Sequence, residues 1–349
     1  MRELRYWQAL SEGLIQAMEA DESVFVMGVG VDDPKGIFET TLEAHRRFGS
    51  QRVFDIPLSE NAITGAAIGA SLCGMRPVMV HARNDFMLLT LDQLFNNAAK
   101  WRYVSGGSSY VPITVRAIIG RGWGQGAQHS QSLQAVFAHF PGLKVVMPAT
   151  PYDAKGLLIA SIRDNSPVIS IEHRRLYDYT GPVPEDPFEV PLGKAIVRRP
   201  GRDITIAAAS LMVSEALKAA DALEEHDISA EVLDLRTISP MDDELIFDSV
   251  RRTHRLVVAD TAWENGGIGA EIISRVVGNV FSYLEAPAKR VASPNVPAPV
   301  CSTLERLFYP GSDEIAAAAF EVVSGKPALA LAQYSHPLRP LDEDFHGPF

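Results

Sequence analysis

The regular alternation of apolar runs with helix-like segments is the feature that most constrains the fold of this chain. In both halves, short runs rich in Val, Ile, Leu, Met and Ala alternate with segments of helical periodicity. Such alternation is typical of parallel strands, because parallel neighbours need a crossover connection that is usually a helix. We therefore expect an α/β fold with two doubly wound domains, each a parallel sheet covered by helices on both faces.

A proline-rich stretch interrupts this alternation near the middle of the chain. Residues 173–202 contain five prolines, and we interpret them as a crossover between domains. The length of 349 residues also suits about two domains of ordinary size. We expect an N-terminal domain at 1–180, a linker at 181–202, a C-terminal domain at 203–333 and a tail at 334–349.

The individual elements follow from the same pattern. Strands are expected at 24–29, 52–56, 76–81, 111–119, 144–147, 167–172, 204–209, 230–235, 255–260 and 289–292. Helices are expected at 6–20, 37–48, 60–72, 87–103, 152–163, 212–226, 241–253, from the Gly266 turn to about 284, and from 312 onward.

Charge and composition exclude several function classes. The net charge of −11 argues against nucleic acid or an anionic membrane as the main partner. No apolar run reaches the roughly 20 residues of a membrane helix, and the polar N-terminus lacks the apolar core of a signal peptide. Cys73 and Cys301 have no metal-ligand spacing and do not indicate a disulfide. A cytoplasmic location is expected.

One acidic residue stands at the entrance of an unusual helix. Glu60 follows Ser59, which we expect to cap the helix, and the next residues are small, apolar and uncharged. The absence of any other charge predicts that the helix is buried. Glu60 itself fits either a functional carboxylate or an exposed acid at a helix N-terminus, where acids are generally favoured.

Two further candidates follow strands of the first half. The segment His81–Phe86 comes after the strand at 76–81, and His129 lies beyond the glycine-rich loop that begins at Gly120. Ligands of open parallel sheets bind beyond the carboxyl ends of strands, so these groups could serve acid–base chemistry together with Glu60. The glycines repeat at every second position, which does not match a dinucleotide fingerprint. Taken singly, His129 also fits a solvated loop residue and Phe86 a core aromatic.

Several longer motifs carry a family resemblance over nearly the whole chain. They are Phe54-Asp-Ile-Pro-Leu-Ser-Glu-Asn61, Asp92-Gln-Leu-Phe-Asn-Asn-Ala-Ala-Lys100, Gln128-His-Ser-Gln-Ser132, Pro141-Gly-Leu-Lys-Val-Val-Met-Pro148, Asp234-Leu-Arg-Thr-Ile-Ser-Pro-Met-Asp242 and Gly266-Gly-Ile-Gly-Ala-Glu271. In order and spacing the chain resembles the beta subunit of thiamine-diphosphate-dependent 2-oxoacid dehydrogenases, within the transketolase-like group. The resemblance implies an enzyme that decarboxylates a 2-oxoacid and transfers the acyl group.

The resemblance also implies roles for individual residues. Glu60 matches the glutamate that hydrogen-bonds the aminopyrimidine ring of the cofactor, and Phe86 matches the aromatic against that ring. Ala82 and Leu89 take neighbouring cofactor-binding positions. His129 matches the histidine that assists proton or acyl transfer. Backbone carbonyls of four residues match a potassium site of some relatives, namely Ile113, Ser161, Asp164 and Ser166.

One motif of the family is missing. Thiamine diphosphate is held through magnesium by a Gly-Asp-Gly stretch, and this chain contains none. Asn96 and Asn97 have no such stretch upstream. The resemblance therefore implies that a separate alpha subunit, which holds the magnesium and the diphosphate, completes the site in an α2β2 assembly.

The substrate and the acyl acceptor stay open at this stage. His81, Arg83 and Asn84 differ from common family residues, as do Arg121 and Trp123 in the glycine loop. A lipoyl acyltransferase is one expected partner. The alternatives are a split transketolase-like or acyloin-forming enzyme without a lipoyl partner, and a non-catalytic scaffold subunit.

Overall fold

The structure is a computed structural model that describes residues 1–33, 35–120 and 124–327. The predicted tail at 334–349, the end of the predicted second domain, Arg121 and Trp123 lie outside the described residues. The chain divides into two compact units. The first comprises residues 1–120, 136–192 and 237–240, and the second comprises residues 121–135, 193–236 and 241 onward.

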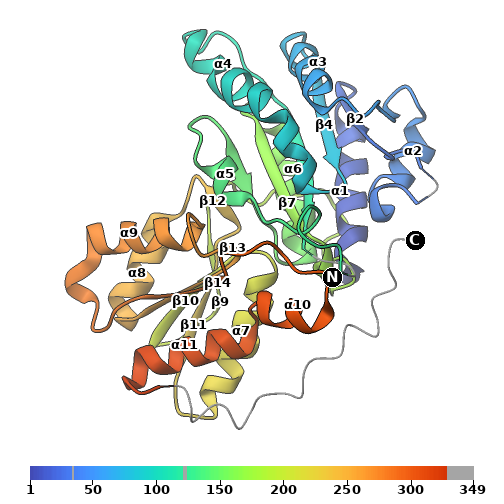
Figure 1. Cartoon of the computed structure of the whole chain (residues 1–349). Coiled ribbons are helices and arrows are strands. Elements are labelled where there is room, and N and C mark those ends of the chain that lie inside the picture. Colours follow the sequence, from blue (N-terminus) through green and yellow to red (C-terminus); the bar gives the residue numbers. More distant parts are fainter. Residues whose placement is uncertain (34, 121–123, 328–349) are drawn as a thin grey trace. The chain divides into compact units, whose positions relative to one another are not determined.

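The first unit is built on a seven-stranded sheet of order β12-β6-β7-β5-β4-β2-β3 (Figure 1). The strands are β2 (Val24–Gly28), β3 (Val53–Phe54), β4 (Arg76–His81), β5 (Thr114–Ile119), β6 (Lys144–Val146), β7 (Val168–His173) and β12 (Thr237–Ser239). All pairings are parallel except that of β12 with β6. The predicted parallel α/β architecture is thus confirmed, with one antiparallel edge strand that the sequence pattern did not indicate.

Helices join the strands of this unit, as the alternation predicts. They are α1 (Tyr6–Ala20), α2 (Leu42–Phe48), α3 (Glu60–Leu72), α4 (Ala99–Val104), α5 (Gln134–Ala138) and α6 (Pro151–Arg163). On α1, Leu10, Leu14 and Met18 are inaccessible to solvent, whereas Trp7 is half-buried. A small antiparallel pair, β1 (Arg2–Arg5) with β8 (Thr180–Val183), stands apart from the main sheet.

The expected single helix at 87–103 is wrong in its details. The segment is a 3₁₀ helix at Asn84–Thr90, a π-helix at Asp92–Ala98 and then α4. Within the π-helix, Asn96 donates a hydrogen bond to Asp92 and Asn97 donates one to Gln93. Apolar periodicity does not distinguish these helix types, and π-turns occur often at functional sites.

The second unit has a five-stranded sheet of order β14-β13-β10-β11-β9. Its strands are β9 (Ile196–Arg199), β10 (Ile204–Ala208), β11 (Ala230–Asp234), β13 (Leu256–Trp263) and β14 (Lys289–Ser293). Its helices are α7 (Leu211–Glu224), α8 (Asp243–Thr253), α9 (Ile268–Val280), α10 (Ser302–Phe308) and α11 (Ser312–Ser324). Neither α10 nor the antiparallel strand β9 was expected, and β9 gives regular structure to part of the predicted linker.

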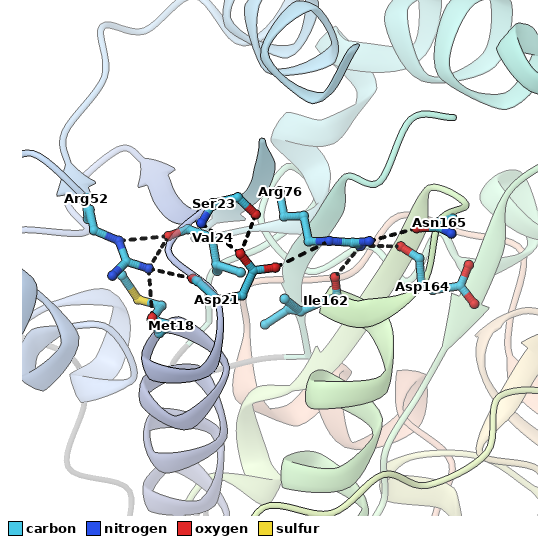
Figure 2. A network of polar contacts seen from close by, with 9 residues as sticks. All are labelled: Met18, Asp21, Ser23, Val24, Arg52, Arg76, Ile162, Asp164 and Asn165. Carbon is cyan, nitrogen blue, oxygen red and sulfur yellow. Dashed lines mark hydrogen bonds and ion pairs between the residues drawn. The ribbon is translucent and has the colours of Figure 1, made fainter. Parts of the chain in front are cut away.

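Arg52 and Arg76 form hydrogen bonds at the edge of the first sheet where its strands begin (Figure 2). Arg52 donates hydrogen bonds to the carbonyls of Met18, Asp21 and Val24, at the end of α1 and the start of β2. The Met18 carbonyl lies in the last turn of α1, where helical carbonyls lack an intrahelical donor, and the guanidinium supplies one. The network fixes α1 relative to the first parallel strand.

Replacement of Arg52 by Met should therefore destabilise the protein. Loss of charge-assisted bonds to three carbonyls costs about 2–3 kcal/mol, or roughly 5–10 °C in Tm. Arg46→Met is the matched control, because Arg46 is exposed and has only a 3.4 Å pair with Glu43. Differential scanning fluorimetry should show a Tm within about 1 °C of wild type for the control. Equal shifts in the two variants would contradict this account of the edge.

Candidate active site

The carboxyl ends of the parallel strands in the first unit gather the predicted cofactor-binding residues. Residues after β3 lead into Glu60, and residues after β4 lead through Ala82 to Phe86. The neighbouring strand β2 ends at Gly28, and the amide of Gly30 donates to the Asp55 carboxylate at 2.8 Å. This hydrogen bond joins the loops that follow β2 and β3 on the side of the sheet where α/β enzymes bind ligands.

Glu60 is the first residue of α3 and its side chain is half-buried. Ser59 occupies the cap position, but its side chain makes no capping hydrogen bond, so that expectation is wrong. Its ψ of 55° departs from the extended conformation of an ordinary cap. The hydroxyl of Thr64 instead donates to the Glu60 carbonyl at 2.6 Å, within the first turn. Glu60 lies in the first turn of α3, a position where acidic side chains generally stabilise a helix.

An open hollow of about 640 Å³ lies beside Glu60. Its lining residues are Leu58, Ser59, Glu60, Asn61, Ala62, Gly65, Leu89 and Gln93. Gly65 of α3 lies close to the Gln93 side chain, because a Cβ at Gly65 would lie 3.4 Å from the Gln93 side-chain oxygen. The structure thus brings together Glu60 and Leu89 of the predicted site. Gln93 was missed, although its place one turn beyond Leu89 could have indicated it.

Phe86 and Ala82 lie on the segment that leads to this hollow. Phe86 is 38% exposed, which excludes the alternative that it is a core aromatic. Between them, buried Arg83 donates to the Gly120 carbonyl at 2.7 Å and so links the ends of β4 and β5. The Phe86 amide in turn bonds the Arg83 carbonyl, which fixes the aromatic residue to the same framework.

His81, at the end of β4, does not offer an accessible acid or base. Burial lowers the pKa of its imidazole to about 4, because the charged form loses its hydration. The ring is therefore neutral near pH 7. Its Nε2 atom has no hydrogen-bond partner among the residues that the structure describes.

The expectation that α3 is buried is also wrong in part. Thr64, Ala67 and Ile68 face the sheet, whereas Ala62, Ala66 and Gly69 are exposed. The outer face of α3 is therefore uncharged and is not covered by the part of the chain that the structure describes.

His129 belongs to the second compact unit, whereas Glu60 belongs to the first. We refer to residues 124–135 as the His129 loop. At one end of the loop, a Cβ at Gly124 would lie 2.8 Å from the Val300 carbonyl, and one at Gly126 would lie 2.7 Å from a Val300 methyl. The glycines therefore allow the loop to pack closely on the segment before α10. His129 itself is half-buried.

The four predicted potassium ligands lie at the opposite edge of the first sheet from Glu60. Ile113 precedes β5, Ser161 lies in α6, and Asp164 and Ser166 lie between α6 and β7. The Ile113 carbonyl accepts from the Val168 amide, and the Asp164 carbonyl accepts from Arg76 at 3.0 Å (Figure 2). Each carbonyl keeps a second lone pair for a cation.

Two further findings concern metal-binding clusters and membrane-spanning helices. Within residues 1–33, 35–120 and 124–327, no three His, Cys, Asp or Glu side chains form a group that could hold a metal. In the same ranges, no helix combines the length and apolar character needed to cross a bilayer.

The family of the protein follows from comparison with known sequences. Residues 2–180 match the transketolase pyrimidine binding domain, and residues 193–315 match the transketolase C-terminal domain. The chain therefore belongs to the transketolase-like family, whose members depend on thiamine diphosphate. The resemblance drawn from the motifs is confirmed.

Its relatives include beta subunits of several dehydrogenases. The chain is 44% identical over 334 residues to the beta subunit of acetoin:2,6-dichlorophenolindophenol oxidoreductase from Cupriavidus necator, with 93% of this chain and 98% of the relative covered. It is 43% identical to the mitochondrial pyruvate dehydrogenase E1 component subunit beta-2 of Oryza sativa, covering 91% and 86%. It is 42% identical to the 2-oxoisovalerate dehydrogenase subunit beta of Bacillus subtilis, covering 92% and 99%. Beta subunits of this kind work with an alpha subunit.

A solved structure supports the fold alone. The structure described as a split gene transketolase, inactive beta4 tetramer, superposes with a TM-score of 0.74 at 21% identity. The match covers 92% of this chain and 98% of that one.

Proposed function

We propose that this chain is the catalytic beta subunit of a heteromeric thiamine-diphosphate enzyme that decarboxylates a 2-oxoacid and transfers the acyl group. One observation carries the proposal: Glu60 is the first residue of α3 and lies beside an open hollow lined by both polar and apolar residues, at the carboxyl edge of a pyrimidine-binding domain. A carboxylate so placed can hydrogen-bond a flat, nitrogen-containing ring that enters from one side.

In this proposal, different residues of the chain have different roles. When bound, thiamine diphosphate supplies the carbanion-stabilising chemistry that decarboxylation requires. Glu60 would exchange a proton with a ring nitrogen of the aminopyrimidine and so raise the basicity of its amino group. Phe86, Ala82 and Leu89 would hold the ring in place by apolar contact. His129 would assist a later proton or acyl transfer, as a general acid or base.

The chain lacks the means to hold the diphosphate. It contains no Gly-Asp-Gly stretch, and the side-chain amides of Asn96 and Asn97 are engaged within their own helix by Asp92 and Gln93. Magnesium prefers carboxylate and phosphate oxygens, so the missing ligands must come from elsewhere. We assign them to an alpha subunit in an α2β2 assembly.

The surface near Glu60 suits such a partner. Leu58 is 78% exposed and Leu89 is 60% exposed, and both adjoin the uncharged outer face of α3. Apolar side chains that gather around a functional hollow typically mark an interaction site. The exposed small residues Ala62, Ala66 and Gly69 would let a partner backbone approach closely.

The reaction has a second candidate. The most similar relatives named above include an acetoin-oxidising enzyme, so cleavage of an acyloin is the alternative to decarboxylation of a 2-oxoacid. In either case a lipoyl acyltransferase is the proposed acyl acceptor. Exposed, unpaired Cys73 and Cys301 support a reducing compartment, for which we propose the cytoplasm.

Potassium is proposed as a structural ion. The carbonyls of Ile113, Ser161, Asp164 and Ser166 come from three segments that meet at the start of β5 and β7. An ion there would join these segments through the lone pairs that Val168 and Arg76 leave free. It has no part in the chemistry at Glu60.

The test of the central assignment is Glu60→Gln in the assembled enzyme. Loss of the ionisable proton should lower turnover by about 10²–10⁴-fold, the usual contribution of general acid–base catalysis. Glu43→Gln is the control, since Glu43 also lies in the first turn of a helix, α2. Circular dichroism should show an intact fold in both variants. Near-normal turnover with Glu60→Gln would remove the assignment and favour the scaffold alternative.

The partner assignment predicts how the isolated chain binds cofactor. Without magnesium ligands it should bind thiamine diphosphate weakly or not at all, because the charge-assisted contacts to the diphosphate are lost. Titration calorimetry on the purified chain, then on the complex with an alpha subunit, makes the comparison. Tight, stoichiometric binding by the isolated chain would show that the split-site proposal is wrong.

A further inference from the structure

A half-buried carboxylate in the second unit makes contacts for which the proposed chemistry gives no reason. Asp260 lies on β13, and its side chain is half-buried. Desolvation raises the pKa of its carboxyl, while hydrogen bonds from neighbouring amides and from Gln134 oppose that rise. A carboxylate that loses part of its hydration is stabilised where donors replace the lost water.

The donors to Asp260 come from three separate segments. One carboxylate oxygen accepts from the side-chain amide of Gln134 at 2.5 Å and from the backbone of Ala262 at 3.3 Å. The other oxygen accepts from the backbone amide of Ile268 at 3.2 Å, the first residue of α9. Asp260 therefore joins the end of β13, the start of α9 and the far end of the His129 loop.

Gln134, the first residue of α5, is the residue of the His129 loop that bonds Asp260. It is completely buried, and its amide nitrogen also lies 3.2 Å from the Thr261 hydroxyl. Its amide oxygen has no donor among the residues that the structure describes. The bonds of the amide nitrogen to Asp260 and Thr261 therefore hold this side chain in place, and the one to Asp260 is the shorter and is charge-assisted.

The His129 loop is thus fixed at both ends within one unit. Gly124 and Gly126 press against Val300 at one end, and Gln134 bonds Asp260 at the other. His129 lies between these anchors, five residues before Gln134. A catalytic side chain on a loop needs such support, because an error of about 1 Å in its position can cost about 100-fold in rate.

We infer that Gln134 and Asp260 form a positioning pair that sets the place of His129 through a single amide-to-carboxylate hydrogen bond. The inference deepens the proposed function and rests on the assigned role of His129. Neither residue is assigned any contact with cofactor or substrate. Their effect passes through the backbone of the His129 loop.

The direct test replaces Gln134 by Glu in the assembled enzyme. Two carboxyls at this separation repel each other when both are ionised, so one of them takes a raised pKa. At low pH the pair shares a proton and keeps the loop in place. As pH rises through the raised pKa, the proton leaves and repulsion displaces the loop. Glu264, which follows Asp260 on the same segment, is paired with Arg290 of β14 at 3.2 Å.

Activity should therefore fall with rising pH in Gln134→Glu but not in wild type. We expect kcat to drop about tenfold between pH 6 and pH 8, with little change in KM. Adding Asp260→Asn exchanges the donor and the acceptor, which restores one hydrogen bond. That double variant should regain kcat to within about threefold of wild type at pH 8.

Hydrogen–deuterium exchange of residues 124–135 provides a readout that does not depend on catalysis. Exchange should be about tenfold faster in Gln134→Glu at pH 8 and return toward wild type in the double variant. If the exchange responds but His129→Ala leaves turnover intact, the positioning pair stands and the role of His129 fails. Should Gln134→Glu not assemble, Gln134→Met serves instead and should loosen the loop equally at both pH values.

Two results would overturn the inference. One is an unchanged exchange rate and pH profile in Gln134→Glu, since the hydrogen bond would then not fix the His129 loop. The other is a double variant no better than the single one, since the effect would then arise from altered packing rather than from the hydrogen bond.

Discussion

The parallel register of buried strands is the constraint on which the rest of this structure depends. Because β2, β3, β4 and β5 pair in parallel, their carboxyl ends lie at the same edge of the sheet. That edge receives Glu60, Ala82 and Phe86, while the arginine network secures the opposite edge. The catalytic side can therefore carry open, irregular segments, since the stability of the sheet does not rest on them.

Much of the fold could be predicted from the sequence, because each strand and helix repeats its own apolar period. The parts that escaped prediction lack such a signal. Strands β9 and β12 are short edge strands, and the 3₁₀ and π segments after β4 share the periodicity of an ordinary helix. Within the candidate site, Glu60 and Phe86 were predicted from motifs. The junction of Gln134 with Asp260 was not, because the two residues are 126 positions apart.

The proposed chemical roles are divided between the two units of the chain. The first unit holds the groups assigned to the cofactor ring, and the second holds the histidine assigned to the later transfer. Within the residues that the structure describes, neither unit contains a cluster of side chains that could hold a metal, and the outer face of α3 is left uncovered. The proposed partner subunit would explain both facts, because it would supply the metal site and cover that face.

Proton exchange at the thiazolium carbon of bound cofactor tests this division most directly. In the reconstituted enzyme, rapid-quench NMR should show exchange lost with Glu60→Gln and retained with His129→Ala, even though both variants lose turnover. That result would place cofactor activation in the first unit and the later step in the second. Exchange that survives without the Glu60 carboxylate, or collapses without the His129 imidazole, would contradict the account.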